Sequence, residues 1–255
     1  MSKLISYYFK RDKWIFLVMV GGALLGSLLL WGYTGEESAV GAVTIFAGVM
    51  SFFFAVAIVP LWLFIRDYKR MYGSYGSFFA ALPLTGKEVM GGRAIWFIIM
   101  QILGILSSLM FIVPFLIANV NRDAEIRNIF ADIMKQVGPN YLIGFALAVI
   151  AGILFSAAVW LFVTSVGSEK PFRRFGIGGP IMLYIGLQVA INVVTRAVVN
   201  AMGSQREIVN EEFFHQVASQ QFFRTSLVLS GLMLIAAVVL YLRSVHSHDK
   251  KLSVS

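Results

Sequence analysis

The chain has few side chains of the kinds that catalysis or metal binding would need. An intramembrane metalloprotease would place its zinc ligands inside the long apolar runs. The three histidines of this chain, His215, His246 and His248, all lie outside those runs. The pair His246-x-His248 supplies too few ligands for a metal site, and cysteine is absent. No serine lies in a convincing nucleophile motif. We therefore expect no enzyme activity, and no catalytic, cofactor-binding or metal-binding residue.

One stretch comes close to a phosphate-binding loop but fails at two positions. Such a loop needs a glycine, four residues, and then glycine-lysine followed by serine or threonine. Its backbone amides then surround the phosphate while the hydroxyl reaches magnesium. Here Gly86-Lys87 is followed by Glu88, and Ala81 stands where the first glycine should be. The chain has no ATP-binding motif of its own, so energy for any work must come from a partner or an ion gradient.

The composition indicates an integral membrane protein. Of 255 residues, 58% are hydrophobic and 13% are charged, and the mean hydropathy is +0.80. This is more apolar surface than one soluble core can bury. Because the runs are continuously apolar, they predict helices and not a barrel of alternating strands. We expect an all-α polytopic protein in which residues 1–255 form one domain. Six runs reach the roughly 20 residues that a spanning helix needs: 14–33, 39–65, 94–118, 141–166, 176–202 and 225–242.

The basic residues predict an orientation. Fifteen of the 21 lysines and arginines fall in the N-terminal segment, the loops after the second and fourth runs, and the C-terminal tail. Five fall on the opposite side, which also carries eight of the 13 acids. Since lysine and arginine accumulate in cytoplasmic loops, both termini are predicted to be cytoplasmic. Anionic headgroups attract such residues, so the net charge of +8 indicates lipids, and not nucleic acid, as partners.

The segment before the first run has an amphipathic pattern. Its apolar side chains fall on one side of a helical wheel and its lysines on the other. This pattern is typical of a helix that lies in the cytoplasmic interface, although a short frayed extension with ordinary flanking charges would share it. The apolar side is formed by Leu4, Ile5, Tyr8 and Phe9.

The cytoplasmic loop of residues 66–93 carries an aromatic stripe. Its members recur at i, i+3, i+4 and i+7, which predicts a short amphipathic helix. Pro83 disfavours helical geometry at the residue before it and would end that helix. A stripe of this kind needs a cover, and the pattern alone leaves open whether lipid or a partner protein supplies it. The stripe consists of Tyr75, Phe78, Phe79 and Leu82.

The next helix has its own start signal. Thr85 followed by Glu88 has the spacing of a capping box, in which the two side chains bond to each other's backbone amides. The loop therefore predicts a helix, a sharp stop and a new helix.

This loop resembles one from a known family. The order of an aromatic-rich turn, Leu82-Pro83-Leu84-Thr85, Gly86-Lys87-Glu88-Val89 and Gly91-Gly92-Arg93 is similar to the second-to-third-span loop of ABC type-2 exporter permeases. The preceding stretch Arg66-Asp67-Tyr68-Lys69-Arg70-Met71-Tyr72-Gly73 is similar too. The number of runs, the chain length and the N-terminal segment agree with that family.

The resemblance implies a mechanical role. In such permeases two six-span subunits, identical or related, form the pathway, and the loop acts as a coupling helix on a separate ATPase subunit that binds ATP and magnesium. It implies a multi-pass protein of a bacterial cell membrane, most like exporters of peptides and antimicrobials in Gram-positive bacteria. The docking face would be Tyr75, Phe78, Phe79, Leu82 and Pro83, flanked by Arg70 and Lys87.

The loop between the fifth and sixth runs is the second candidate site. Residues 208–217 follow a helical rhythm, and the family often has short helices here that dip into the outer leaflet and close an extracellular gate. An ordinary polar loop with a surface helix would show the same rhythm. Arg196 lies about 30 Å along its run, near the outer interface. The resemblance implies gate residues Arg196, Phe213 and Phe214.

A secondary carrier or channel is the alternative. Carriers place coupling acids or broken helices near the membrane midplane, and the six runs contain no acidic residue. This favours a pathway driven from outside the membrane. Because the runs are rich in phenylalanine, methionine and leucine, we expect a hydrophobic or amphipathic substrate, such as a peptide toxin, an antimicrobial peptide or a drug.

Overall fold

The computed structural model describes residues 2–31, 46, 50, 53, 59–72, 85–122, 124, 127–128, 131, 138–202 and 211–249. Within these ranges the regular structure is entirely helical. The helices are α1 (Ser2–Trp31), α3 (Val59–Tyr72), α5 (Gly86–Arg122), α7 (Pro139–Val166), α8 (Lys170–Arg173), α9 (Gly178–Met202) and α10 (Glu211–Ser247). Backbone groups have no water to bond with in lipid, so apolar segments satisfy them within a helix.

Four helical segments in the described part are long and apolar enough to cross a membrane. They are Gly86–Met110, Pro139–Val166, Gly178–Ala201 and Gln221–Ser247. They fall on the third to sixth predicted runs, which confirms a helical protein of membrane type. The first run lies in α1 up to Trp31, and most of the second run lies outside the described residues.

Two predicted boundaries differ from the structure. The N-terminal segment is not a separate helix, because α1 runs without interruption from Ser2 to Trp31. Likewise α10 starts at Glu211 and runs without interruption through Arg224, so residues 211–217, where short helices were expected, are part of α10. No glycine or proline stands between residues 211 and 230. Nothing in that stretch therefore interrupts the helical hydrogen bonds.

The chain divides into two compact units. The first comprises Met1–Ser74 and Gly91–Asp132, and the second comprises Tyr75–Met90 and Ile133–Ser255. Helix α5 contributes its first residues to the second unit and the rest to the first. The expectation of a single membrane domain over residues 1–255 stays a prediction.

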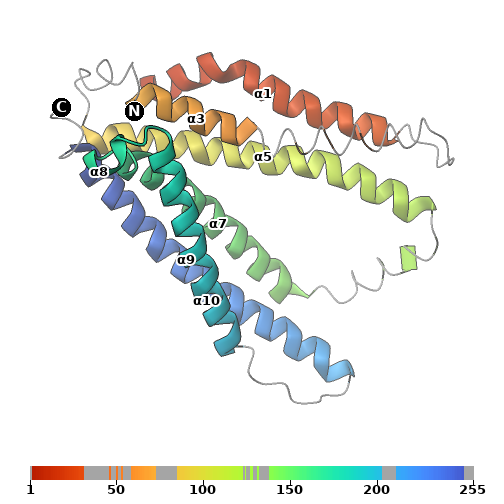
Figure 1. Ribbon diagram of the computed structural model, residues 1–255. Helices are drawn as coiled ribbons and strands as arrows, with labels where there is room; N and C mark the ends of the chain where they lie inside the picture. Colours follow the sequence, from red (N-terminus) through yellow and green to blue (C-terminus); the bar gives the residue numbers. More distant parts are fainter. Residues whose placement is uncertain are drawn as a thin grey trace. The chain divides into compact units, whose positions relative to one another are not determined.

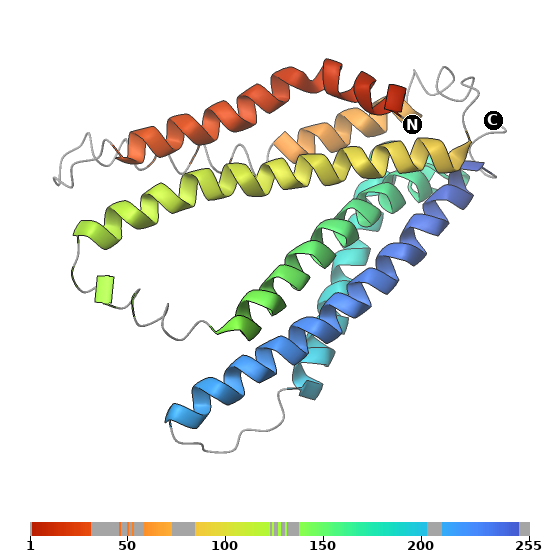
Figure 2. The same ribbon diagram turned by 180° about the vertical axis from the view of Figure 1, so that it is seen from behind.

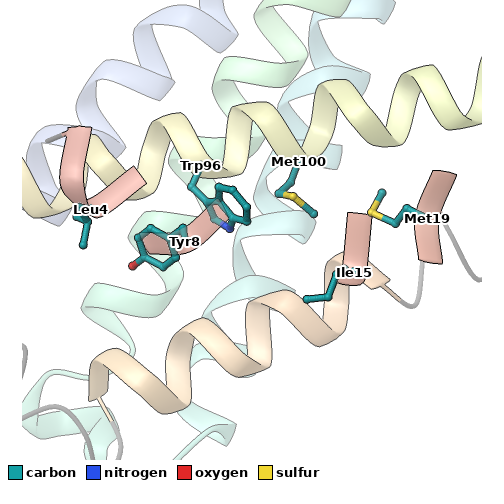
Figure 3. Close-up of a cluster of buried hydrophobic side chains, with 6 residues drawn as sticks. All are labelled: Leu4, Tyr8, Ile15, Met19, Trp96 and Met100. Atoms are coloured by element: carbon teal, nitrogen blue, oxygen red, sulfur yellow. The ribbon is translucent and has the colours of Figure 1, made fainter. Parts of the chain in front are cut away.

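In the first unit, α3 lies beside α1 and α5 (Figures 1 and 2). One side of α1 is buried against α5, and the Tyr8 ring stacks on Trp96 with the ring centres 5.7 Å apart. Figure 3 shows this cluster of buried side chains. Along each helix its members are four or seven residues apart, as expected for one side of a helix. They are Leu4, Tyr8, Ile15, Met19, Trp96 and Met100.

In the second unit, α7 and α10 run side by side (Figures 1 and 2). The buried side of α7 carries small residues, Ala151, Ala157 and Ala158, which let membrane helices approach closely. Stacked rings of Trp160 and Tyr184, 5.3 Å apart, connect α7 to α9. The unit is therefore held by close packing of small residues and by aromatic contacts.

A tight turn connects α7 to α9 through the short helix α8. The backbone of α7 comes very close to the start of α9 at Gly167, which is buried. Gly176 has φ +55°, a conformation that favours glycine because it has no Cβ. Glu169, buried in this turn, binds the Arg243 guanidinium of α10 at 2.7 Å. The turn is thus attached to the end of α10.

Replacing Gly167 should destabilise the second unit. A Cβ there would lie 2.5 Å from the Val163 carbonyl oxygen and 2.7 Å from the Pro180 nitrogen, and both are backbone atoms that cannot rotate away. We expect Gly167→Ala to cost about 1–3 kcal/mol, measured as a lower midpoint of thermal unfolding in detergent. Gly152→Ala is the control, because a Cβ at Gly152 has no described neighbour within 4 Å. Equal midpoints for the two variants would contradict the packing of this turn.

Candidate functional site

The candidate site is the pair of helix ends that flank the aromatic loop. The predicted docking residues Tyr75, Phe78, Phe79, Leu82 and Pro83 lie outside the described residues. The structure describes the chain on both sides of them, where α3 ends at Tyr72 and α5 begins at Gly86. The described part of the site therefore consists of these two helix ends and the contacts that they make.

A buried ion pair connects α3 to α5 in the first unit. The Arg93 guanidinium donates from Nε to Asp67 Oδ2 at 3.1 Å, and its Nη2 donates to the same oxygen. Arg93 is 0% exposed, and the Asp67 side chain is 7% exposed. An isolated charge at such a position would cost several kcal/mol, so each partner requires the other. The pair fixes two helices next to the chain's aromatic loop.

Two tyrosines complete the surroundings of this pair. Arg93 Nη1 donates to the Tyr72 hydroxyl at 3.1 Å, and the Tyr8 hydroxyl of α1 is 3.5 Å from Asp67 Oδ1. Burial raises the pKa of Tyr8 well above its usual value, and the nearby Asp67 carboxylate raises it further. Tyr8 therefore keeps its proton, and its hydroxyl donates a hydrogen bond to the carboxylate. Through these bonds, α1, α3 and α5 share one polar network.

The network follows from local spacing. Phe64, Asp67 and Met71 recur at i, i+3 and i+7 on one side of α3, and all three are buried. Arg93 follows Met90 by three residues, and both are fully buried on α5. From the sequence, Arg93 and Asp67 are expected only as residues of the cytoplasmic loop and of its family-like motif, with no predicted contact between them. The available signal was that Asp67 is the one acid among the bases of Arg66-Asp67-Tyr68-Lys69-Arg70.

A second, partly exposed network lies between α1 and α3. Asp12 is 1% exposed and accepts hydrogen bonds from Arg11 at 2.9 and 3.0 Å, and it pairs with Arg66 Nη1 at 3.1 Å. Burial opposes the charge on Arg11, but hydrogen bonding to Asp12 and Tyr7 and the negative charge of Asp12 together outweigh it and raise the pKa of the guanidinium. The sequence does not predict a buried position for Asp12 or for Asp67, because an acid among basic residues is ordinarily expected to face water.

Exposed tryptophan rings lie beside basic residues of α1 and α3. Arg66 lies 5.1 Å from the centre of the Trp62 ring, and Lys13 lies 5.8 Å from that of Trp14. Trp14 is 68% exposed and Trp62 is 48% exposed. Tryptophan beside a basic residue is typical of the headgroup level of a membrane. These parts of α1 and α3 carry side chains that are typical of a membrane interface.

The predicted capping box is confirmed. The Thr85 backbone amide donates to Glu88 Oε2 at 2.9 Å, and the Glu88 amide donates to Thr85 Oγ1 at 3.3 Å. Helix α5 begins at the next residue, Gly86. It has 37 residues, so at 1.5 Å per residue it is about 55 Å long and exceeds the roughly 30 Å of a hydrocarbon layer. A helix of this length can cross a hydrocarbon layer and extend beyond it.

The remaining predicted site residues are dispersed. Arg70 is partly exposed in the last turn of α3, and Lys87 is exposed in the first turn of α5. They flank the aromatic loop as predicted. Arg196 is exposed in α9, six residues before that helix ends. Phe213 and Phe214 belong to α10, but their side chains lie outside the described part, so their proposed gate stays a prediction.

The described arrangement positions helices and offers little chemistry. Among the described residues, no group of three or more histidines, cysteines, aspartates or glutamates could hold a metal ion. The buried acids Asp12, Asp67 and Glu169 each bind an arginine. Comparison with protein-family models, curated proteins and solved structures finds no match to this chain.

Removing one partner of the Asp67–Arg93 pair should destabilise the protein more than removing both partners. Asp67→Leu leaves the Arg93 charge buried without its carboxylate, and we expect a loss of about 3–5 kcal/mol of stability. Asp67→Leu with Arg93→Met should recover a large part of that loss, because no charge then remains buried. Thermal unfolding in detergent and the yield of folded protein measure both effects.

Arg66→Ala is the control, since the Arg66 guanidinium is partly exposed and Asp12 keeps its pair with Arg11, so that no buried charge is left without a partner and we expect a smaller loss. A double variant no more stable than Asp67→Leu alone would show that the pair is not the element that holds α3 to α5.

Proposed function

We propose that this chain is the membrane permease subunit of an ATP-driven exporter. It would act in a bacterial cell membrane with both termini in the cytoplasm, and would pair with a second permease subunit. A separate ATPase subunit would bind ATP and magnesium and dock on the aromatic loop. The resemblance of residues 66–93 to exporter loops is the source of this proposal.

One observation carries the proposal furthest. The loop with the aromatic stripe leaves α3 and enters α5 at two helix ends that a buried ion pair joins, Asp67 with Arg93. Tyr72, the last residue of α3, also binds Arg93. A loop that receives a push from a partner must be attached rigidly to the helices that it moves, because slack at its ends would absorb the motion. The buried pair supplies that attachment.

The charge distribution agrees with an external energy source. The buried acids that the structure describes lie outside the predicted runs and bind arginines, and the runs hold no acid that could couple to protons or sodium. The described helices instead expose leucine, isoleucine, valine and phenylalanine. A pathway of such side chains fits a hydrophobic or amphipathic substrate, such as a peptide toxin, an antimicrobial peptide or a drug.

Disrupting the aromatic stripe should release the ATPase. Phe78→Asp with Phe79→Asp places two charges in the expected docking face, so an ATPase that co-purifies with the chain from its native membrane should be lost. Export of an amphipathic peptide should fall with it. Phe78→Tyr with Phe79→Tyr is the control, because it keeps the aromatic surface and should retain the partner. If the chain purifies without any ATPase under gentle solubilisation, a carrier or channel becomes the better interpretation.

The chain lacks cysteine, which makes its topology easy to test. We expect a membrane-impermeant maleimide to label Ser38→Cys and Ser204→Cys in intact cells, since both lie in loops predicted to be outside. Ser253→Cys in the C-terminal tail should react only after the membrane is permeabilised. Labelling of Ser253→Cys in intact cells would reverse the predicted orientation, and failure at Ser38→Cys would remove the first pair of spans.

A further inference from the structure

We infer that Asp249 is a positioning residue: it clamps the start of α5, at the exit of the aromatic loop, to the end of α10. The clamp belongs entirely to the second unit, which contains residues 75–90 and 133–255. Its role in transport rests on the proposed function, but its geometry does not.

The contact is a carboxylate at a helix N-terminus. The Gly86 backbone amide donates to Asp249 Oδ1 at 2.8 Å. Gly86 is the first residue of α5, so its amide is one of those that the helix itself leaves unbonded. The aligned peptide dipoles also favour negative charge at that end. Asp249 thus meets both a hydrogen-bonding need and an electrostatic preference of α5.

The clamp requires glycine at residue 86. A Cβ there would lie 2.6 Å from Asp249 Cγ and would overlap the carboxylate. Gly86 is buried, although it stands between the exposed residues Thr85 and Lys87. The close approach of the Asp249 carboxylate is thus possible because residue 86 has no side chain.

The end of α10 is itself fixed to α7. The Ser247 hydroxyl donates to the Ser165 carbonyl oxygen at 3.3 Å, and both residues are fully buried. Ser165 Oγ also lies 3.7 Å from the sulfur of Met90, one turn into α5, which is also fully buried. After Ser247 the chain continues as a wider, π-helical turn through His248 and Asp249. Three helices therefore meet at this point: α5, α7 and α10.

This junction has a mechanical consequence. The loop that we propose as the ATPase docking site ends at Thr85, one residue before the clamp. A displacement of the loop that moves the start of α5 is transmitted to α7 and α10 through the contacts of Asp249, Ser247 and Met90. We infer that the clamp couples movement of the loop to these two helices, so that loss of the Asp249 carboxylate separates ATP hydrolysis from export.

The geometry can be tested by a disulfide in the cysteine-free chain. Gly86→Cys with Asp249→Cys brings two sulfurs to positions where a bond of about 2.0 Å can close. With mild oxidant in membranes, the pair should lose most of its reaction with a mass-tagging maleimide, and reductant should restore it. Gly86→Cys with His246→Cys is the matched control, because His246 is exposed on α10 three residues earlier. Equal reactivity of both pairs would overturn the clamp.

The role in coupling needs a second readout. Asp249→Ala should leave ATPase co-purification and ATP turnover near those of the unchanged protein while export per ATP falls several-fold. Asp249→Asn keeps an oxygen acceptor for the Gly86 amide and should retain most coupling. Gly86→Ala should reproduce the defect of Asp249→Ala, because its Cβ displaces the carboxylate although alanine favours a helix.

The outcomes separate the two proposals. Full export per ATP in both Asp249→Ala and Gly86→Ala would overturn the coupling role. A disulfide between residues 86 and 249 in a chain that binds no ATPase would uphold the clamp. That result would overturn the proposed function, and with it the coupling role.

Discussion

The burial of Arg93 is the constraint on which the described part of the first unit depends. A guanidinium removed from water must keep a carboxylate and further acceptors, or its charge costs several kcal/mol. Asp67 and Tyr72 supply these from α3, and Tyr8 of α1 orients toward the same carboxylate. Hydrophobic contacts between helices tolerate sliding, since one apolar side chain can replace another. A buried, hydrogen-bonded pair does not, so the register of α3 against α5 is specified by this one contact.

The same principle explains where the second unit is least tolerant of change. Here the contacts that specify register are a carboxylate on a helix start at Gly86, a partly buried pair between Glu169 and Arg243, and a close backbone approach at Gly167. All of them lie near helix ends. Between the ends, small residues of α7 pack along α10 with little directional bonding. The contacts that specify register in this unit are therefore concentrated near helix ends, and apolar packing of α7 along α10 joins the rest.

Much of the helical architecture could be predicted from the sequence, because runs of apolar residues are a local signal. Four runs fall on four described helices, and the Thr85–Glu88 capping box starts α5 as predicted. Helix limits were less predictable. The segment before Trp14 continues into α1 without a break, and residues 211–224 continue into α10, because polar residues alone do not end a helix. Only glycine, proline or a competing cap does so reliably.

The contacts of the candidate site could not be predicted, and the reason is physical. Asp12, Asp67 and Asp249 stand among lysines and arginines or in a tail, where a solvated acid is the ordinary expectation. Their partners are far away in the chain: 26 residues separate Asp67 from Arg93, and 163 separate Asp249 from Gly86. A pattern of single residues carries no information about such pairing. Yet Asp12 and Asp67 are both buried and bind arginines, so a lone acid within a basic helical segment is worth testing for a buried partner. Applied to membrane proteins generally, that criterion would direct attention to helix ends, where pairing can specify packing without placing charge in the hydrocarbon.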